Sequence, residues 1–264
     1  MRKVILFAAI ALLFAGMASA ADWRNNAGES GLEAARAGKT VSIRGYNSDT
    51  DAMSSADAIW SGSSGDTNTV TTIAPQAVVL VSENASDTST LGGARTVTIS
   101  AIDNDYAVVT ETVVMSGTTQ VSTISGDMIY VNSMSVATAG STGYNVGDID
   151  ARADSGHTCV NSIVATRNSS ECASYLVPAG KTLYLLGMTG GAGTTEGTLE
   201  VQAKDLVNGT TWAPVVVVPY SKTSATTANL EGITVPEKHL VRVVINNATA
   251  DSVKSAVAVT AAID

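Results

Sequence analysis

Short runs in which apolar and polar residues alternate are the feature that most constrains the fold of this chain. In the clearest run, Val97, Ile99 and Ala101 alternate with residues that carry hydroxyl groups. Similar alternation recurs at 199–204 and 253–261. A period of two places each set of side chains on one face of a β-strand. We therefore expect strands with one buried face and one face toward solvent.

Turn-forming sequences separate these runs, and no convincing helical pattern lies between them. Gly92-Gly93, Ser116-Gly117 and Asn208-Gly209 are examples. Hydrophobic residues make up 45% of the chain and charged residues only 15%, which is too apolar for a disordered chain. The sequence therefore predicts an all-β protein, a β-sandwich or jelly roll, either as one body or as two stacked sandwich halves.

The first twenty residues have the three parts of a secretory signal peptide. The basic start Met1-Arg2-Lys3 precedes the apolar stretch 4–17, which is too short to span a bilayer comfortably. Small residues at Ala18-Ser19-Ala20 then suit a signal peptidase. We expect cleavage between Ala20 and Ala21, export of the protein and no stable membrane anchor. The alternative is a hydrophobic N-terminus that the mature protein retains.

After the signal peptide at 1–20, the composition divides the chain into three further segments. Residues 21–38 are polar and contain three glycines, which predicts an N-terminal arm or linker. A first β-sandwich half is expected at 39–155 and a second at 156–264. The boundary falls in a polar stretch at 153–156, which separates either two domains or two halves of one roll.

Two cysteines, Cys159 and Cys172, lie close together in a chain that carries an export signal. Exported proteins fold in oxidising compartments, so we predict a disulfide that closes one hairpin. A metal site is the weaker interpretation, because this spacing does not suit paired zinc thiolates and no second pair of cysteines exists.

The titratable residues form no pattern that is typical of a catalytic site. The two histidines, His157 and His239, have no serine or cysteine nucleophile near them in a recognisable motif. Asp103 and Asp105 offer oxygen ligands and are weak candidates for calcium, but Asp is also an ordinary turn residue. We therefore expect no enzymatic activity, no cofactor and no metal site beyond that weak candidate.

The charge of the chain excludes two classes of partner. The formal net charge is −9, and removal of Arg2 and Lys3 with the signal would take it two units lower, to −11. Binding to duplex nucleic acid depends mainly on neutralised phosphates, so we expect no nucleic-acid partner. The same acidic balance argues against binding to anionic lipid surfaces.

Four strand-and-turn motifs carry a resemblance to a known family. They are the sequences Gly-Ala-Arg-Thr-Val at 93–97, Thr-Glu-Thr-Val with Gly-Thr-Thr at 110–119, Val-Pro-Ala-Gly-Lys-Thr at 177–182 and Pro-Glu-Lys at 236–238. Together they resemble a family of β-rich virion structural proteins from tailed bacteriophages, which is seen also among large DNA viruses. The resemblance covers about residues 70–262, and each motif is also a plausible strand or turn on physical grounds.

The resemblance implies a non-enzymatic structural subunit of a virus particle, of the capsid-surface or head-fibre type, located in the virion. It implies a homo-oligomer, with a trimer as the first expectation by analogy, and contacts with other particle proteins. Strands rich in Val and Thr also favour self-association, because sheet edges must be covered. The export signal and the cysteine pair favour an alternative, an exported bacterial cell-surface or filament subunit or adhesin-like module, extracellular or periplasmic. A secreted carbohydrate-active enzyme is a third hypothesis, without a pair of carboxylates to support it.

Overall fold

The computed structural model describes residues 39–47, 57–58, 70–153, 159–192, 196–209, 211–221, 226–247 and 255–264. Within these ranges the chain contains strands, turns and loops and no α-helix. Its antiparallel sheets pack in pairs, which confirms the prediction of an all-β protein with a β-sandwich architecture. The finer assignment to a jelly roll stays a prediction.

The larger sandwich is built from both ends of the chain, and we call it the base sandwich. One sheet has the strand order β1-β16-β11-β14 and the other has the order β10-β15-β12-β13, with the short β2 on β15. Its strands are β1 (Thr40–Asn47), β2 (Asp57–Ala58), β10 (Ser174–Leu176), β11 (Leu183–Ala192), β12 (Gly197–Asp205), β13 (Ala213–Tyr220), β14 (Thr226–Val235), β15 (His239–Asn247) and β16 (Ser255–Ile263).

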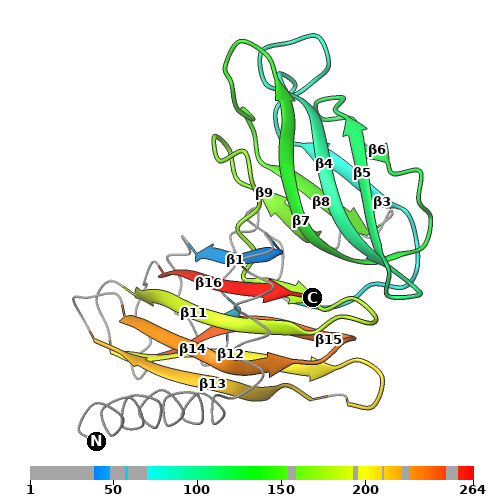
Figure 1. Cartoon of the computed structure of the whole chain (residues 1–264). Helices are drawn as coiled ribbons and strands as arrows, with labels where there is room; N and C mark the ends of the chain where they lie inside the picture. The colour runs from blue at the N-terminus through cyan, green and yellow to red at the C-terminus, as the bar shows by residue number, and fades with distance from the viewer. Residues whose placement is uncertain are drawn as a thin grey trace, which may run out of the picture.

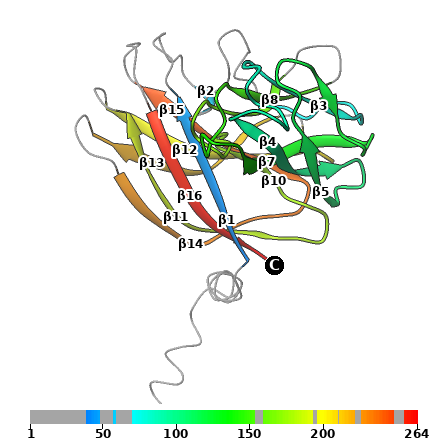
Figure 2. The same ribbon diagram turned by 90° about the horizontal axis from the view of Figure 1, so that it is seen from above.

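The smaller sandwich lies between β2 and β10 in the sequence, and we call it the inserted sandwich. Its sheets have the orders β6-β3-β8-β9 and β5-β4-β7. Its strands are β3 (Val78–Ser82), β4 (Ala94–Asp103), β5 (Val108–Val114), β6 (Val121–Ser122), β7 (Met128–Ala139), β8 (Ile149–Ala153) and β9 (Cys159–Ile163). It stands above the base sandwich in Figure 1, and the view from above places it to one side, opposite β13 and β14 (Figure 2).

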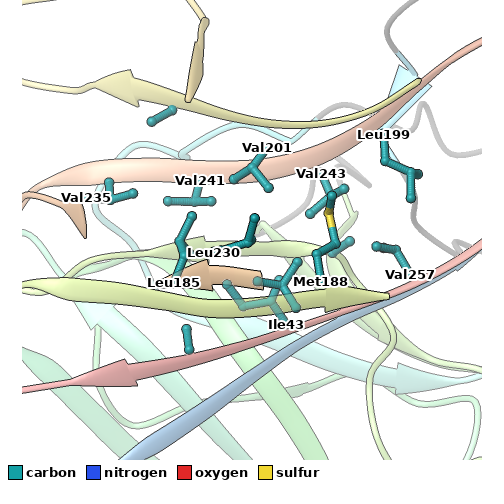
Figure 3. Close-up of a cluster of buried hydrophobic side chains, with 14 of the residues drawn as sticks. Ile43, Leu185, Met188, Leu199, Val201, Leu230, Val235, Val241, Val243 and Val257 are labelled. Carbon is teal, nitrogen blue, oxygen red and sulfur yellow. The ribbon is translucent and has the colours of Figure 1, made fainter. Parts of the chain in front are cut away.

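The alternating sequence pattern produces the two cores. In β4, Val97, Ile99 and Ala101 are fully buried in the core of the inserted sandwich, while the hydroxyl residues between them are only partly buried. In the base sandwich, Leu185 and Met188 point from β11 into the space between the sheets, where aliphatic side chains of the opposite sheet meet them (Figure 3). Burying each such side chain stabilises the fold by about 1.5–3 kcal/mol.

The predicted boundary between two sandwich halves is wrong. β1 pairs with β16 from Thr40↔Ala262 to Asn47↔Ser255, so it belongs to the sandwich formed by the C-terminal part of the chain. β9 pairs with β8, so the expected boundary near 155 falls inside one sheet. The reason is that a strand pattern defines which face is buried and does not identify the partner strand. The predicted signal peptide and arm, residues 1–38, lie outside the described residues.

Candidate functional site: the joint, the tip loops and the exposed β5 edge

The predicted disulfide is not formed in the structure. Both cysteines are buried thiols whose side chains belong to one small apolar cluster. The Cys159 thiol donates a hydrogen bond to the backbone oxygen of Asn161 at 3.3 Å, and Cys172 Sγ lies 2.9 Å from Ser174 Oγ. The expected hairpin is also wrong, because β9 pairs with β8 in the inserted sandwich whereas β10 pairs with β15 in the base sandwich.

The weak calcium candidates occupy a turn between β4 and β5. Asp103 Oδ1 accepts hydrogen bonds from the backbone N–H groups of Asp105, at 2.9 Å, and Ala107, at 2.8 Å. This geometry accounts for Asp103 as a residue that stabilises its own turn. In the part of the chain that the structure describes, no group of three or more His, Cys, Asp or Glu side chains is arranged to hold a metal ion.

The remaining sequence-predicted positions contribute no common site. Ala20, Ala21 and His157 lie outside the described ranges. His239 begins β15, and its Nδ1 lies 2.9 Å from the backbone oxygen of Glu237. Among the predicted positions that the structure describes, it brings together the two cysteines in one cluster and Asp103 with Asp105 in one turn. The features that remain as candidates are a joint, a pair of loops and a sheet edge, none of which the sequence singled out.

The two sandwiches meet in an apolar cluster that we call the joint. Ile102 and Tyr130 of the inserted sandwich are buried against Leu176 and Leu240 of the base sandwich. Val70 and Ile129 complete the buried part of the cluster. Because these side chains are 0–7% exposed, separation of the sandwiches would expose apolar surface on both sides.

Hydrogen bonds fix the orientation of the joint. The side chain of Asn132 in β7 accepts a hydrogen bond from Leu176 N, at 2.7 Å, and donates one to Leu176 O, at 3.0 Å, as a neighbouring strand would. Tyr130 Oη lies 2.5 Å from Ser174 Oγ. Burial raises the pKa of Tyr130 well above its usual value, so this phenol stays neutral. The directional bonds and the apolar cluster together make the pair of sandwiches one stiff unit.

At the upper end of the inserted sandwich in Figure 1, residues 83–93 and 140–148 form two packed loops, which we call the tip loops. Asp87 is completely buried beneath them. Its Oδ1 accepts from Ala94 N at 2.7 Å and Val146 N at 2.8 Å, and its Oδ2 accepts from Gly147 N at 2.8 Å and Ser82 Oγ at 2.6 Å. One carboxylate therefore ties both loops to the sheet.

A second buried polar side chain holds the far loop. Asn145 Nδ2 donates to the backbone oxygens of Gly147, at 2.8 Å, and Val164, at 2.9 Å, and Asn145 Oδ1 accepts from Asn168 N at 3.1 Å. The loops are also packed closely, because a Cβ at Gly140 would lie 2.3 Å from the oxygen of Leu91. The tip loops are thus held rigidly, with exposed side chains at Leu91 and Tyr144.

The third candidate is an exposed sheet edge formed by β5 with Ile124, which we call the β5 edge. Among the described strands, β5 pairs only with β4. Val108 and Val114 are 55% and 54% exposed, and Ile124 is 94% exposed. Glu111, the one charged residue in β5, accepts hydrogen bonds from the backbone N–H groups of Ile124, at 2.7 Å, and Ser125, at 3.3 Å.

Sequence reasoning missed these features because their signal is not local. Asp87 resembles the other aspartates of turns until the tertiary structure brings three backbone N–H groups to it. Ile124 offered a signal that could have been used, since it is an isolated large apolar residue in the polar stretch 122–127. Single exposed apolar residues are common, so this signal becomes informative only together with the sheet edge beside it.

The comparisons with known proteins leave the family unassigned. No protein-family model matches this chain, and no curated protein matches it. Within the described ranges, we find no helix with the length and apolar character needed to cross a membrane.

Proposed function

We propose that this chain is a non-enzymatic structural subunit of a virus particle and that it acts by self-association through the β5 edge. The observation that carries the proposal is Ile124, a large apolar side chain that is 94% exposed next to an edge strand. Isolated exposed apolar residues are common, but the backbone of Ile124 is bonded to Glu111 of β5, an edge strand that can pair with a further strand.

The chemistry of β5 supports a contact with a second copy. Its sequence, Val-Val-Thr-Glu-Thr-Val-Val, has high β-propensity and contains no proline. A charged residue on an edge strand ordinarily discourages pairing, but the Glu111 carboxylate is already bonded to the backbone at 124–125. The edge therefore combines open hydrogen-bonding groups with apolar side chains. The stiff joint suits a building block, because it transmits the orientation of one contact to the rest of the subunit.

Two settings fit such a subunit. The resemblance of residues 70–262 to virion structural proteins of tailed phages supports a virus particle. The basic, apolar and small-residue segments of 1–20 favour an exported bacterial cell-surface or filament subunit as the second candidate. N-terminal sequencing of the protein from purified particles and from the cell envelope decides between them. Recovery in particles supports the first setting, and recovery only in the envelope or culture fluid, with a start at Ala21, supports the second.

Self-association is tested by light scattering coupled to size-exclusion chromatography. Ile124→Glu removes about 2 kcal/mol of apolar burial from each contact, so we expect the dissociation constant to rise about thirtyfold or more. Val207→Glu is the matched control, because Val207 is 60% exposed in a loop of the base sandwich and the change in charge is the same. A monomeric wild-type chain, or equal weakening by both variants, would refute the proposal.

A further inference from the structure

A polar cleft with a volume of about 280 Å³ lies between the two sandwiches. One wall comes from β1 and β10, and the other comes from β4, β7, Ser170 and Cys172. β1 lies on the side of the base sandwich that faces the inserted sandwich (Figure 1). No residue of the β5 edge or of the tip loops lines this cleft, so a ligand in the cleft would occupy a surface other than the one proposed for self-association.

Arg44 is the one charged residue among those that line the cleft. Its side chain is exposed, and its Nε donates a hydrogen bond to Ser42 Oγ at 2.9 Å. No carboxylate lies in the lining, and no ion pair of Arg44 occurs among the described residues. Guanidinium groups bind carboxylates through two parallel N–H···O bonds. In a chain of net charge −9, this cleft therefore has a local preference for an anion.

Hydroxyl groups line the opposite wall. Ser100 of β4 and Ser133 of β7 are register partners, and both line the cleft. Neither side chain makes a hydrogen bond with a described residue, whereas the neighbouring Asn132 is fully used in the joint. Thr40 adds a hydroxyl group on the β1 side. Each hydroxyl can donate one hydrogen bond and accept two, which matches a ligand that carries several hydroxyl groups of its own.

We infer that this cleft binds an acidic sugar, a single uronic acid unit with its carboxylate on Arg44 and its ring hydroxyls on Ser100 and Ser133. The volume is at the lower end of the range of ligand sites, which suits one sugar unit. A nucleic acid is disfavoured because one arginine cannot offset the repulsion between a chain of phosphates and an acidic protein. The inference is independent of the proposed self-association and adds a recognition function to the subunit.

Isothermal titration calorimetry of the full chain with galacturonate, galactose and acetate tests the inference. We expect saturable binding of galacturonate and affinities at least about tenfold lower for galactose, which lacks the charge, and for acetate, which lacks the hydroxyls. Arg44→Gln should lower the affinity for galacturonate by about tenfold or more. Arg95→Gln is the matched control, because Arg95 is also exposed but bonds to Leu91 O near the tip loops.

Three results would overturn the inference: no saturable binding of galacturonate, equal affinity for acetate, or unchanged affinity in Arg44→Gln. Light scattering on Arg44→Gln keeps this test separate from the proposed function, since the variant should retain the wild-type oligomeric state. Ser133→Ala, at an exposed position, should weaken galacturonate binding while leaving acetate binding unchanged. Equal weakening of both ligands would instead show that the serine does not recognise the sugar ring.

Discussion

Replacing Asp87 by alanine tests the claim that one buried carboxylate organises the tip loops. The substitution removes the acceptor of three backbone N–H groups, those of Ala94, Val146 and Gly147. A buried donor without an acceptor costs about 1–3 kcal/mol, and water entering the space left by the side chain recovers part of this. We therefore expect the free energy of unfolding to fall by about 4 kcal/mol, a large share of the stability of a typical domain.

The matched control is Asp103→Ala. Like Asp87, Asp103 accepts hydrogen bonds from backbone N–H groups, in this case two within its own turn. Asp103 is partly exposed, so in the alanine variant water can replace the lost carboxylate as acceptor. We expect a cost of about 1 kcal/mol. Urea unfolding followed by circular dichroism measures both values, and hydrogen exchange of the amides at 146 and 147 should accelerate only in Asp87→Ala. A loss in Asp87→Ala no larger than that in the control would refute the reasoning.

Three further predictions concern packing, the joint and pH. Gly140→Ala should lower the urea midpoint strongly, because its Cβ would lie 2.3 Å from the Leu91 backbone oxygen, whereas Gly126→Ala, with nothing within 4 Å, should not. Asn132→Ala removes both side-chain hydrogen bonds to the β10 backbone and should cost about 2 kcal/mol in the same assay. Burial raises the pKa of Cys172 from 9.0 to about 12, so the unfolded chain loses this proton first. The contribution of Cys172 to stability should therefore be constant below pH 9 and decrease by about 1.4 kcal/mol per unit as pH rises from 9 towards 12, so the overall decrease in this range should be shallower in Cys172→Ala.

The sequence predicted the faces of the strands well, because burial on a sheet follows a period of two. Val257, Val259 and Ala261 are buried in β16, and the residues between them that the structure describes are exposed. β3 differs from these alternating strands, because residues 77–81 are all apolar and Val78, Val79 and Leu80 are buried on both of its faces. These outcomes depend only on neighbouring residues, and local patterns are therefore sufficient.

The partners of the strands could not be predicted in the same way. β1 pairs with a strand more than 200 residues later, at Thr40↔Ala262, and any alternating strand would have satisfied the same local pattern. The cysteines illustrate both cases. The two side chains lie close together, as their short separation in the sequence suggests. The predicted hairpin is wrong because β9 and β10 belong to different sandwiches. Arg44 and Ser133 likewise meet at one cleft only through the tertiary arrangement.

The chemistry of two edge strands decides which of them can serve as a contact between copies. β13 is the edge strand of its sheet, and its valines at 215–218 are exposed or half-buried. By hydrophobicity alone, β13 would be as suitable a contact strand as β5. Pro214 and Pro219 flank these valines and have no N–H to donate to an added strand. β5 contains no proline, and Glu111, its one charge, is already bonded to the backbone beside Ile124. Of these two edges, β5 is therefore the better suited to accept an added strand, which favours it over β13 as the proposed contact between copies.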